Sequence, residues 1–397
     1  MRPSLLSIRL SFFFACLAGI AVGAPGQSSS SGGGRGESVE VTVTADRDLG
    51  PRLAALGYSG HDVDLRVGRR IEIARFSLLA SELPQLRSDL GPTAVVGITR
   101  LSRPYRETAL ALQQAAGTDM PIPEYRTTQE VADGLLALET GYPAIVKRYD
   151  LQSRYGVPTT HDGNSIFVLR ISDRPDVDED EPNLLVFANN HSRELNSIEA
   201  PFMVAERLVQ GYGIDPVLTA LVDENQIWIL PNMNPDGLDY VWNQNDMWRK
   251  NRRDNGDGTF GVDLNRNYEF AWATCGSSSR TSSGVYHGPA AMSEPESVAM
   301  REFTLAEGFE RMIDIHSFSR DVRLPFNPRV INDVPSFFRG AYDRVHAAVA
   351  QAMNYAQRTT CCCGTHMEWH HGQHGTLGML IEMGLSLIHI SEPTRPY

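Results

Sequence analysis

Cysteines are few in this sequence, and positive charge is never concentrated in one stretch. Five cysteines occur in 397 residues, too few for a small scaffold built from disulfides. After Cys16, only Cys275, Cys361, Cys362 and Cys363 remain, and the sequence leaves open whether a bridge joins Cys275 to this triplet or all are free thiols. The formal net charge of -12 is spread along the chain. We therefore expect no nucleic-acid partner.

Long hydrophobic runs are also absent, apart from one at the N-terminus. There, arginines precede the apolar residues 10–22, and small residues follow at Gly23 and Ala24, which is the order of regions in a secretory signal. The run is shorter than the roughly 20 residues that a membrane-spanning helix needs, so a membrane anchor is the less favoured alternative. We predict a signal peptide over residues 1–24, a secreted or periplasmic protein, and no membrane contact after cleavage.

The next hundred residues divide into three short regions. Residues 25–38 are mostly serine and glycine, a composition that predicts a flexible spacer. Residues 39–98 alternate strand-like and helix-like patterns, with Gly57 and Gly91 where helix C-caps are expected. This predicts a small α/β unit. Residues 99–124 carry three prolines and scattered charges, which predicts a connecting segment open to proteolysis.

From Tyr125 onward the pattern changes to that of a larger α/β domain. Near-continuous apolar stretches are separated by helical ones such as residues 200–209. Strands of this kind are typical of a mostly parallel sheet with helices on both faces. The strands are expected near residues 166–171, 184–187, 227–230, 312–315 and 379–381.

Four side chains with metal-binding or proton-transfer chemistry follow these strands. His191 and Glu194 come after one strand, and His316 and Glu382 end two others. Because carboxyl ends of parallel strands share one edge of a sheet, we expect all four groups there. Two imidazoles and a carboxylate leave one zinc position open for a water whose pKa the metal lowers toward about 7. The H-x-x-E spacing alone is a weak signal, since a lone histidine is more often structural.

Arginines lie in two motifs between the ligand segments, at residues 248–252 and 261–267. Both motifs are too apolar and glycine-bounded to be merely a solvated face. The planar guanidinium fork pairs carboxylates in a bidentate manner. An exopeptidase must recognise the free carboxylate of its substrate, and these arginines are candidates for that role.

Taken together, these segments resemble the funnelin-type zinc carboxypeptidases, the group that contains carboxypeptidases A, B and T. The resemblance covers about residues 125–384 and implies a mixed, mostly parallel, twisted sheet of eight strands with helices on both faces. It also implies one zinc ion per chain and a monomer that removes residues from the C-termini of peptides and proteins. It depends on residues 190–194, 231–237, 248–252, 263–267, 286–289, 293–296, 316–319 and 382.

The resemblance also implies a role for each matching residue. His191, Glu194 and His316 would bind the zinc ion, as in the His2Glu site of carboxypeptidase A, and Glu382 would act as general base and then acid. The remaining assignments are Arg252 polarising the scissile carbonyl, Asn265 and Arg266 gripping the substrate carboxylate, Arg193 lining the cleft, Asp263 orienting His191, and Met367 at the bottom of the specificity pocket. Methionine there favours apolar or aromatic C-terminal side chains.

The small unit at residues 39–98 is similar in order and size to bacterial propeptides of this family. Such a propeptide would cover the cleft until cleaved, which makes the chain a zymogen. A separate folding or docking domain is the alternative. Two other functions also stay open: a zinc peptidase acting on bacterial cell-wall peptides, and an inactive peptide-binding homologue.

The chain departs from the family pattern near its C-terminus. Thr360 occupies the position of a cleft-closing tyrosine. Residues 366–374 contain four histidines, which suit a loop better than a second metal cluster because glycines interrupt them. The acidic residues 176–181 favour a solvated loop over a calcium site. Residues 385–397 resemble translated sequencing-adapter read-through, so we expect a non-native tail on a truncated catalytic domain.

Overall fold

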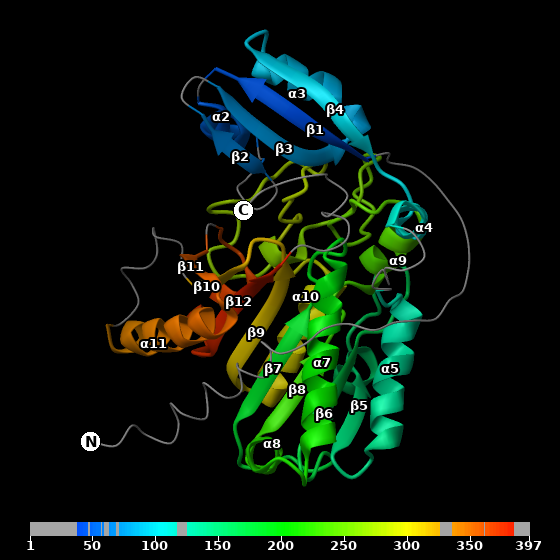
Figure 1. Cartoon of the computed structure of the whole chain (residues 1–397), viewed down its shortest axis with the longest axis vertical. Helices are drawn as coiled ribbons and strands as arrows, with labels where there is room; N and C mark the ends of the chain where they lie inside the picture. Colours follow the sequence, from blue (N-terminus) through cyan, green and yellow to red (C-terminus); the bar gives the residue numbers. More distant parts are fainter. Residues whose placement is uncertain are drawn as a thin grey trace.

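The computed structural model describes residues 38–46, 48–56, 58, 63–68, 71–116, 125–325, 336–360 and 362–384. They form a small domain with one sheet and a large domain with another, and Figure 1 shows the small domain at one end of the large one. The predicted signal peptide, nearly all of the spacer, Gly57, Cys361 and the tail at 385–397 lie outside the described residues.

The small domain confirms the predicted α/β unit. Its sheet has the strand order β2-β3-β1-β4, with antiparallel pairs throughout. Val39, Val41 and Val43 are buried while the residues between them are partly exposed, as a sheet with one covered face requires. Its elements are β1 (Ser38–Ala45), α2 (Leu49–Ala55), β2 (Asp64–Val67), β3 (Glu72–Leu79), η2 (Ala80–Glu82), α3 (Leu83–Leu90) and β4 (Ala94–Leu101).

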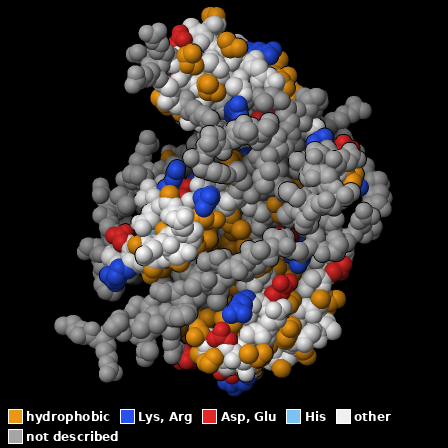
Figure 2. All heavy atoms as spheres, viewed as in Figure 1, with side chains coloured by type: hydrophobic (Ala, Val, Ile, Leu, Met, Phe, Trp, Pro, Cys, Tyr) orange, Lys and Arg blue, Asp and Glu red, His pale blue; other side chains and the backbone are white. Residues whose placement is uncertain are grey.

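The surface of the small domain carries several apolar side chains. Val67 and Val95 are each 71% exposed and Ile98 is 51% exposed, and Figure 2 shows hydrophobic side chains across the upper part of the molecule.

Gly91 caps α3 as predicted: it has a positive φ, and its N–H donates to the carbonyl of Arg87.

The large sheet has eight strands in the order β11-β10-β12-β9-β7-β8-β6-β5. The pairs β7-β8, β7-β9, β9-β12 and β10-β11 are parallel, and the other three are antiparallel. This confirms the mixed, mostly parallel sheet. The strands are β5 (Val146–Asp150), β6 (Phe167–Ile171), β7 (Asn183–Ala188), β8 (Gln226–Leu230), β9 (Phe309–Ser317), β10 (Asp321–Leu324), β11 (Ala356–Thr359) and β12 (Leu377–Met383).

Helices cover both faces of this sheet, as predicted. Alternate residues of β7 enter two separate cores: Val186 belongs to one, whereas Leu185 and Phe187 belong to the other. Burial on both faces explains why these strands are apolar without interruption. The helices of the large domain are α5 (Thr128–Gly141), α6 (Leu151–Tyr155), α7 (Leu195–Gly211), α8 (Pro216–Asp223), α9 (Pro235–Asn243), η3 (Leu264–Arg266), α10 (Pro295–Glu307), α11 (Ser336–Met353) and α12 (His366–His374).

The predicted connecting segment contains regular structure. Helix α4 (Tyr105–Ala116) occupies much of it. Its first residue, Tyr105, is fully buried and lies edge-on to the ring of Trp242, with the two ring centroids 4.9 Å apart. Residues 117–124 lie outside the described part. No helix within the described ranges is both long and apolar enough to cross a bilayer.

Candidate metal centre

Three of the predicted ligands converge at the carboxyl edge of the large sheet. His191 and Glu194 lie in the turn between β7 and α7, and His316 lies near the end of β9, the neighbour of β7. His191 Nδ1 is 2.8 Å from Glu194 Oε1, and His316 Nδ1 is 2.9 Å from Glu194 Oε2. The two Nδ1 atoms are 3.0 Å apart. All three residues are buried.

The outward nitrogen of each histidine faces a second carboxylate. His191 Nε2 lies 3.2 Å from Asp263 Oδ1, and His316 Nε2 lies 3.0 Å from Asp314 Oδ1. This arrangement makes each Nε2 a proton donor and turns the lone pair of each Nδ1 inward. Two lone pairs and a carboxylate then face one point. Tetrahedral zinc with bonds of about 2.0–2.1 Å needs donor atoms about 3.3 Å apart, so the site fits zinc with small adjustments.

Electrostatics also favour a cation at this point. Burial alone would raise the pKa of Glu194, but His191 and His316 outweigh it and hold that pKa well below its ordinary value. Burial would lower the pKa of His316, but Asp314 and Glu194 outweigh it and hold that pKa well above its ordinary value. A proton therefore competes with a metal for this centre, and metal binding is expected to release it.

Glu382 lies beside the three ligands. It is buried on β12, directly opposite His316 in the parallel β9-β12 pair. Its Oε1 is 3.5 Å from Arg323 Nη2. The sheet thus brings together all four groups that the sequence placed at this edge.

The two arginines of the 248–252 motif occupy different places. Arg249 is buried, with Nη1 3.9 Å from Glu194 Oε1 and Nη2 2.9 Å from Asp263 Oδ2. Arg252 instead packs over the rings of Tyr240, Trp248 and Phe260, at 3.8, 4.9 and 4.8 Å from their centroids. The arginine beside the ligands is therefore Arg249, which sequence reasoning missed.

The predicted substrate-binding residues lie around η3. Asn265 Nδ2 is 3.2 Å from His316 Nε2. Arg266 is buried and donates to the carbonyls of Asn265 and Gly276 and to Cys362 Sγ. Arg193 is partly buried, and its Nη1 donates to the carbonyl of Met247, 3.3 Å away.

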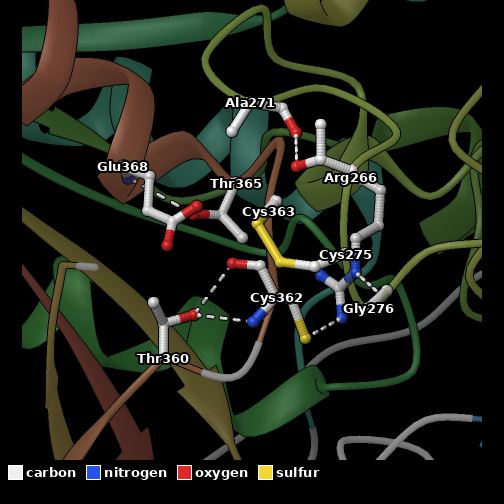
Figure 3. Close-up of a disulfide and its surroundings, with 10 residues drawn as sticks. Arg266, Ala271, Cys275, Gly276, Thr360, Cys362, Cys363, Thr365 and Glu368 are labelled. Atoms are coloured by element: carbon white, nitrogen blue, oxygen red, sulfur yellow. Dashed lines mark hydrogen bonds between the residues drawn. A yellow bond between two sulfur atoms is a disulfide. The ribbon is translucent and has the colours of Figure 1, made fainter. Parts of the chain in front are cut away.

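A disulfide lies next to Arg266. Cys275 and Cys363 form the bridge that the sequence left open, and Figure 3 shows Arg266 reaching Cys362 beside it.

Met367, the predicted pocket residue, is fully buried in one core of the large domain. Thr360 is also buried, with its hydroxyl near the backbone of Cys362.

The histidines at 366–374 lie on helix α12, so the predicted loop was wrong, but the prediction that they form no metal cluster holds for the described residues. Among the described residues, the groups whose ligand atoms lie close enough to share a metal ion do not include them. His366 and His370 are instead fully buried, and burial lowers their pKa values well below the ordinary range. Both are neutral core residues.

A missed residue of this centre is Asp314. It stands two residues before His316 on β9, and successive residues of a strand alternate between faces. That spacing puts both side chains on the same face, so the signal was available in the sequence.

Comparison with known proteins agrees with this geometry. The zinc carboxypeptidase family matches residues 135–379, more than half of the chain. The chain belongs to the zinc carboxypeptidase family. Its members are zinc enzymes, which matches the metal inferred from the donor set.

Individual relatives share part of their length with this chain. Human carboxypeptidase A5 is 34% identical over 207 residues, covering 52% of this chain and 46% of the relative. Rat carboxypeptidase A2 is 29% identical over 250 residues, covering 62% and 57%. A zinc carboxypeptidase of Saccharothrix mutabilis subsp. capreolus is 34% identical over 154 residues, covering 38% and 34%. The chain spans about half the length of the curated relatives it matches.

Solved structures share the fold over most of the chain. Carboxypeptidase A from Helicoverpa armigera has a TM-score of 0.68 at 22% identity, covering 87% of this chain and 88% of that one. Thrombin activatable fibrinolysis inhibitor has a TM-score of 0.61 at 19% identity, covering 87% and 90%. At these identities the likeness establishes the fold alone.

Proposed function

We propose that this chain is a zinc-dependent exopeptidase that hydrolyses the C-terminal peptide bond of peptides or proteins, with His191, Glu194 and His316 as the zinc ligands. The observation that carries this proposal is the convergence of two carboxylate-backed imidazoles and Glu194 beside Glu382. Three protein ligands leave a position for water or substrate, as catalytic zinc sites do.

Each neighbouring residue has a part in the reaction. Zinc, when bound, would lower the pKa of a water molecule and polarise the scissile carbonyl. Glu382 would accept the proton of the attacking water and return it to the leaving amine. Arg249 would donate to the carbonyl oxygen as negative charge develops there. Its position 3.9 Å from Glu194 favours it over Arg252, the residue that the family resemblance suggested.

The substrate would be held by the η3 region. Asn265 and Arg266 would bind the terminal carboxylate, and Arg193 would line the cleft. Met367 lies among apolar residues, so we propose a preference for apolar or aromatic C-terminal side chains.

We further propose that residues 39–98 are a prodomain, that residues 125–384 are the catalytic domain, and that the chain is exported. Arg280 of the large domain donates to the carbonyl of Leu56, and its Nη2 lies 3.8 Å from Glu82 Oε1. Lys250, the neighbour of Arg249, donates to the carbonyl of Thr281, which follows Arg280, so the small domain lies close to this segment. The Cys275–Cys363 bridge suits an oxidising compartment.

The direct test is amino-acid release from N-blocked peptides that differ only at the C-terminal residue. The full chain is assayed before and after limited proteolysis, with and without a zinc chelator. We expect chelator-sensitive release of apolar residues that increases after proteolysis, and no release by Glu382→Gln. Absence of release from folded, zinc-loaded protein would overturn the enzymatic proposal. Release of basic residues would overturn only the assignment of Met367.

A further inference from the structure

A second group of metal-binding side chains lies outside the zinc centre. His161 Nε2 is 2.9 Å from Glu294 Oε2. With Glu296, these residues offer one donor atom each, all within 4.8 Å of one another. Both glutamates are fully buried, whereas the side chain of His161 is 26% exposed. The group therefore has a path to solvent through its histidine.

The loop that presents His161 is firmly held. Asp236 accepts hydrogen bonds from the hydroxyl of Thr160, the backbone N–H of Asp162 and the side chain of Asn164. The N–H of Thr160 also donates to the carbonyl of Asn164, which closes the turn. The imidazole is thus aimed at the glutamates by its loop, across 133 residues of sequence.

Among the described residues, one arginine is paired with the two glutamates. Arg253 Nη1 lies 3.2 Å from Glu294 Oε1, which also accepts from Ser293 Oγ. Asn251 Nδ2 donates to both glutamates, at 2.8 Å from Glu294 Oε2 and 3.1 Å from Glu296 Oε2. Glu296 Oε1 is buried and has no hydrogen-bond partner among the residues that the structure describes.

An unpartnered buried carboxylate oxygen is unfavourable unless a cation or a proton accompanies it. Glu294 brings a second buried carboxylate to the same place, since Asn251 Nδ2 donates to both glutamates. A metal ion between the two glutamates and His161 would therefore be favoured.

We infer that His161, Glu294 and Glu296 form a second site for a divalent cation, distinct from the proposed catalytic zinc site. One imidazole with two carboxylates suits Zn²⁺, which takes both nitrogen and oxygen ligands, better than Ca²⁺, which takes oxygen ligands. The ion joins the turn at residues 160–164 to the start of α10. The segment that carries Arg249 is linked to the site as well, because Asn251 donates to both glutamates. The site goes beyond the proposed peptidase function and gives the chain two metal ions in place of the one predicted.

The test is the stoichiometry of metal bound by the full chain. Protein is stripped with chelator, dialysed and titrated with Zn²⁺ alone, and bound zinc is measured by mass spectrometry; Co²⁺ absorption reports the ligand set. The variants are Glu296→Gln, which keeps the shape and removes the charge, and His161→Ala. Glu181→Gln is the matched control, because Asp173, Glu179 and Glu181 form another acidic group without a histidine.

The expected result is two equivalents of zinc in the wild type and in Glu181→Gln, and one in Glu296→Gln and His161→Ala. Glu194→Gln should lose the other equivalent and keep this one. One equivalent in the wild type, unchanged by Glu296→Gln, would overturn the inference and leave Glu296 as a buried, protonated acid. If Glu296→Gln does not fold, His161→Ala decides, because its side chain is partly exposed. Peptide release is measured separately, so failure here leaves the proposed function standing.

Discussion

The large domain holds two clusters of histidine and glutamate that differ in what surrounds them. In the first, His191 and His316 each have an aspartate on the outer nitrogen, and Glu194 contacts both rings. In the second, the partly exposed His161 lies against Glu294 and Glu296, and Glu296 Oε1 has no hydrogen-bond partner within the described part of the chain. Backing carboxylates fix the tautomer and raise ligand basicity. The first cluster is therefore built for tight binding and the second for weaker binding.

Arginines divide between the clusters in the same way. Arg249 lies beside Glu194, whereas Arg253 pairs with Glu294. A positive charge next to a metal centre that leaves a position open can stabilise negative charge on a substrate. A positive charge paired with a buried glutamate instead neutralises the charge of that glutamate and so stabilises the fold. We therefore propose a catalytic role for Arg249 and a structural role for Arg253.

The strongest test of the difference between the two clusters is to remove one charge from each. Glu194→Gln should abolish zinc binding at the first cluster and bring peptidase activity below detection, because the ligand set is lost. Glu296→Gln should keep activity close to wild type. Activity and zinc content of both variants are measured after the same preparation. Equal loss of activity in both would contradict the division of roles.

The next largest effect separates the two arginines of the 248–252 motif. Arg249→Ala should lower kcat by about 10²- to 10³-fold, the usual effect of removing one donor to a developing oxyanion. Arg252→Ala should mainly lower thermal stability, because it loses its contacts with three aromatic rings. Steady-state kinetics and thermal unfolding check both. The reverse pattern would restore Arg252 as the catalytic arginine.

A smaller effect tests the aspartates that back the first cluster. Asp314→Asn should weaken zinc affinity by about 10- to 100-fold, the range found when such a partner is changed. Asp236→Asn, which alters the support of His161 instead, is the control and should leave affinity at the first cluster unchanged. Competition with a chromogenic chelator measures both affinities. Unchanged affinity in Asp314→Asn would show that the aspartate is only a packing residue.

The last prediction concerns the pH dependence of stability, on which catalysis does not depend. Burial, with Glu294 and Asp236, raises the pKa of Glu296 to about 8, whereas the unfolded value is about 4.3. Between these values the folded chain keeps a proton that the unfolded chain releases, so stability falls as pH rises. We therefore expect the free energy of unfolding of Glu296→Gln, relative to that of the wild type, to increase by up to about a few kcal/mol from pH 5 to pH 8. The measurement is made in excess chelator.

Urea unfolding at both pH values measures this difference. Glu302→Gln on the same helix, where the side chain is partly exposed, is the control and should show no such gain. A difference between wild type and Glu296→Gln that does not change with pH would mean that Glu296 ionises normally in the folded chain.

Much of the architecture follows from local patterns in the sequence. The alternation at Val39, Val41 and Val43 predicts a strand with one buried face, and the unbroken apolar run of β7 predicts one buried on both faces. His191, Glu194, His316 and Glu382 could be grouped because each follows or ends a strand, and parallel strands share an edge. Helix α4 was missed, because its stability depends on Tyr105 packing against Trp242, a contact between distant segments.

The sequence by itself therefore determined the sheet, the edge at which the ligands meet and the kind of metal they suit, since these depend on periodicity and residue type. The tertiary structure decided which arginine reaches Glu194, because residues 248–252 are irregular and periodicity does not fix the direction of their side chains. It also decided the Cys275–Cys363 pairing and the meeting of His161 with Glu294. Both join residues far apart in the chain, and only the packing of separate elements brings such residues together.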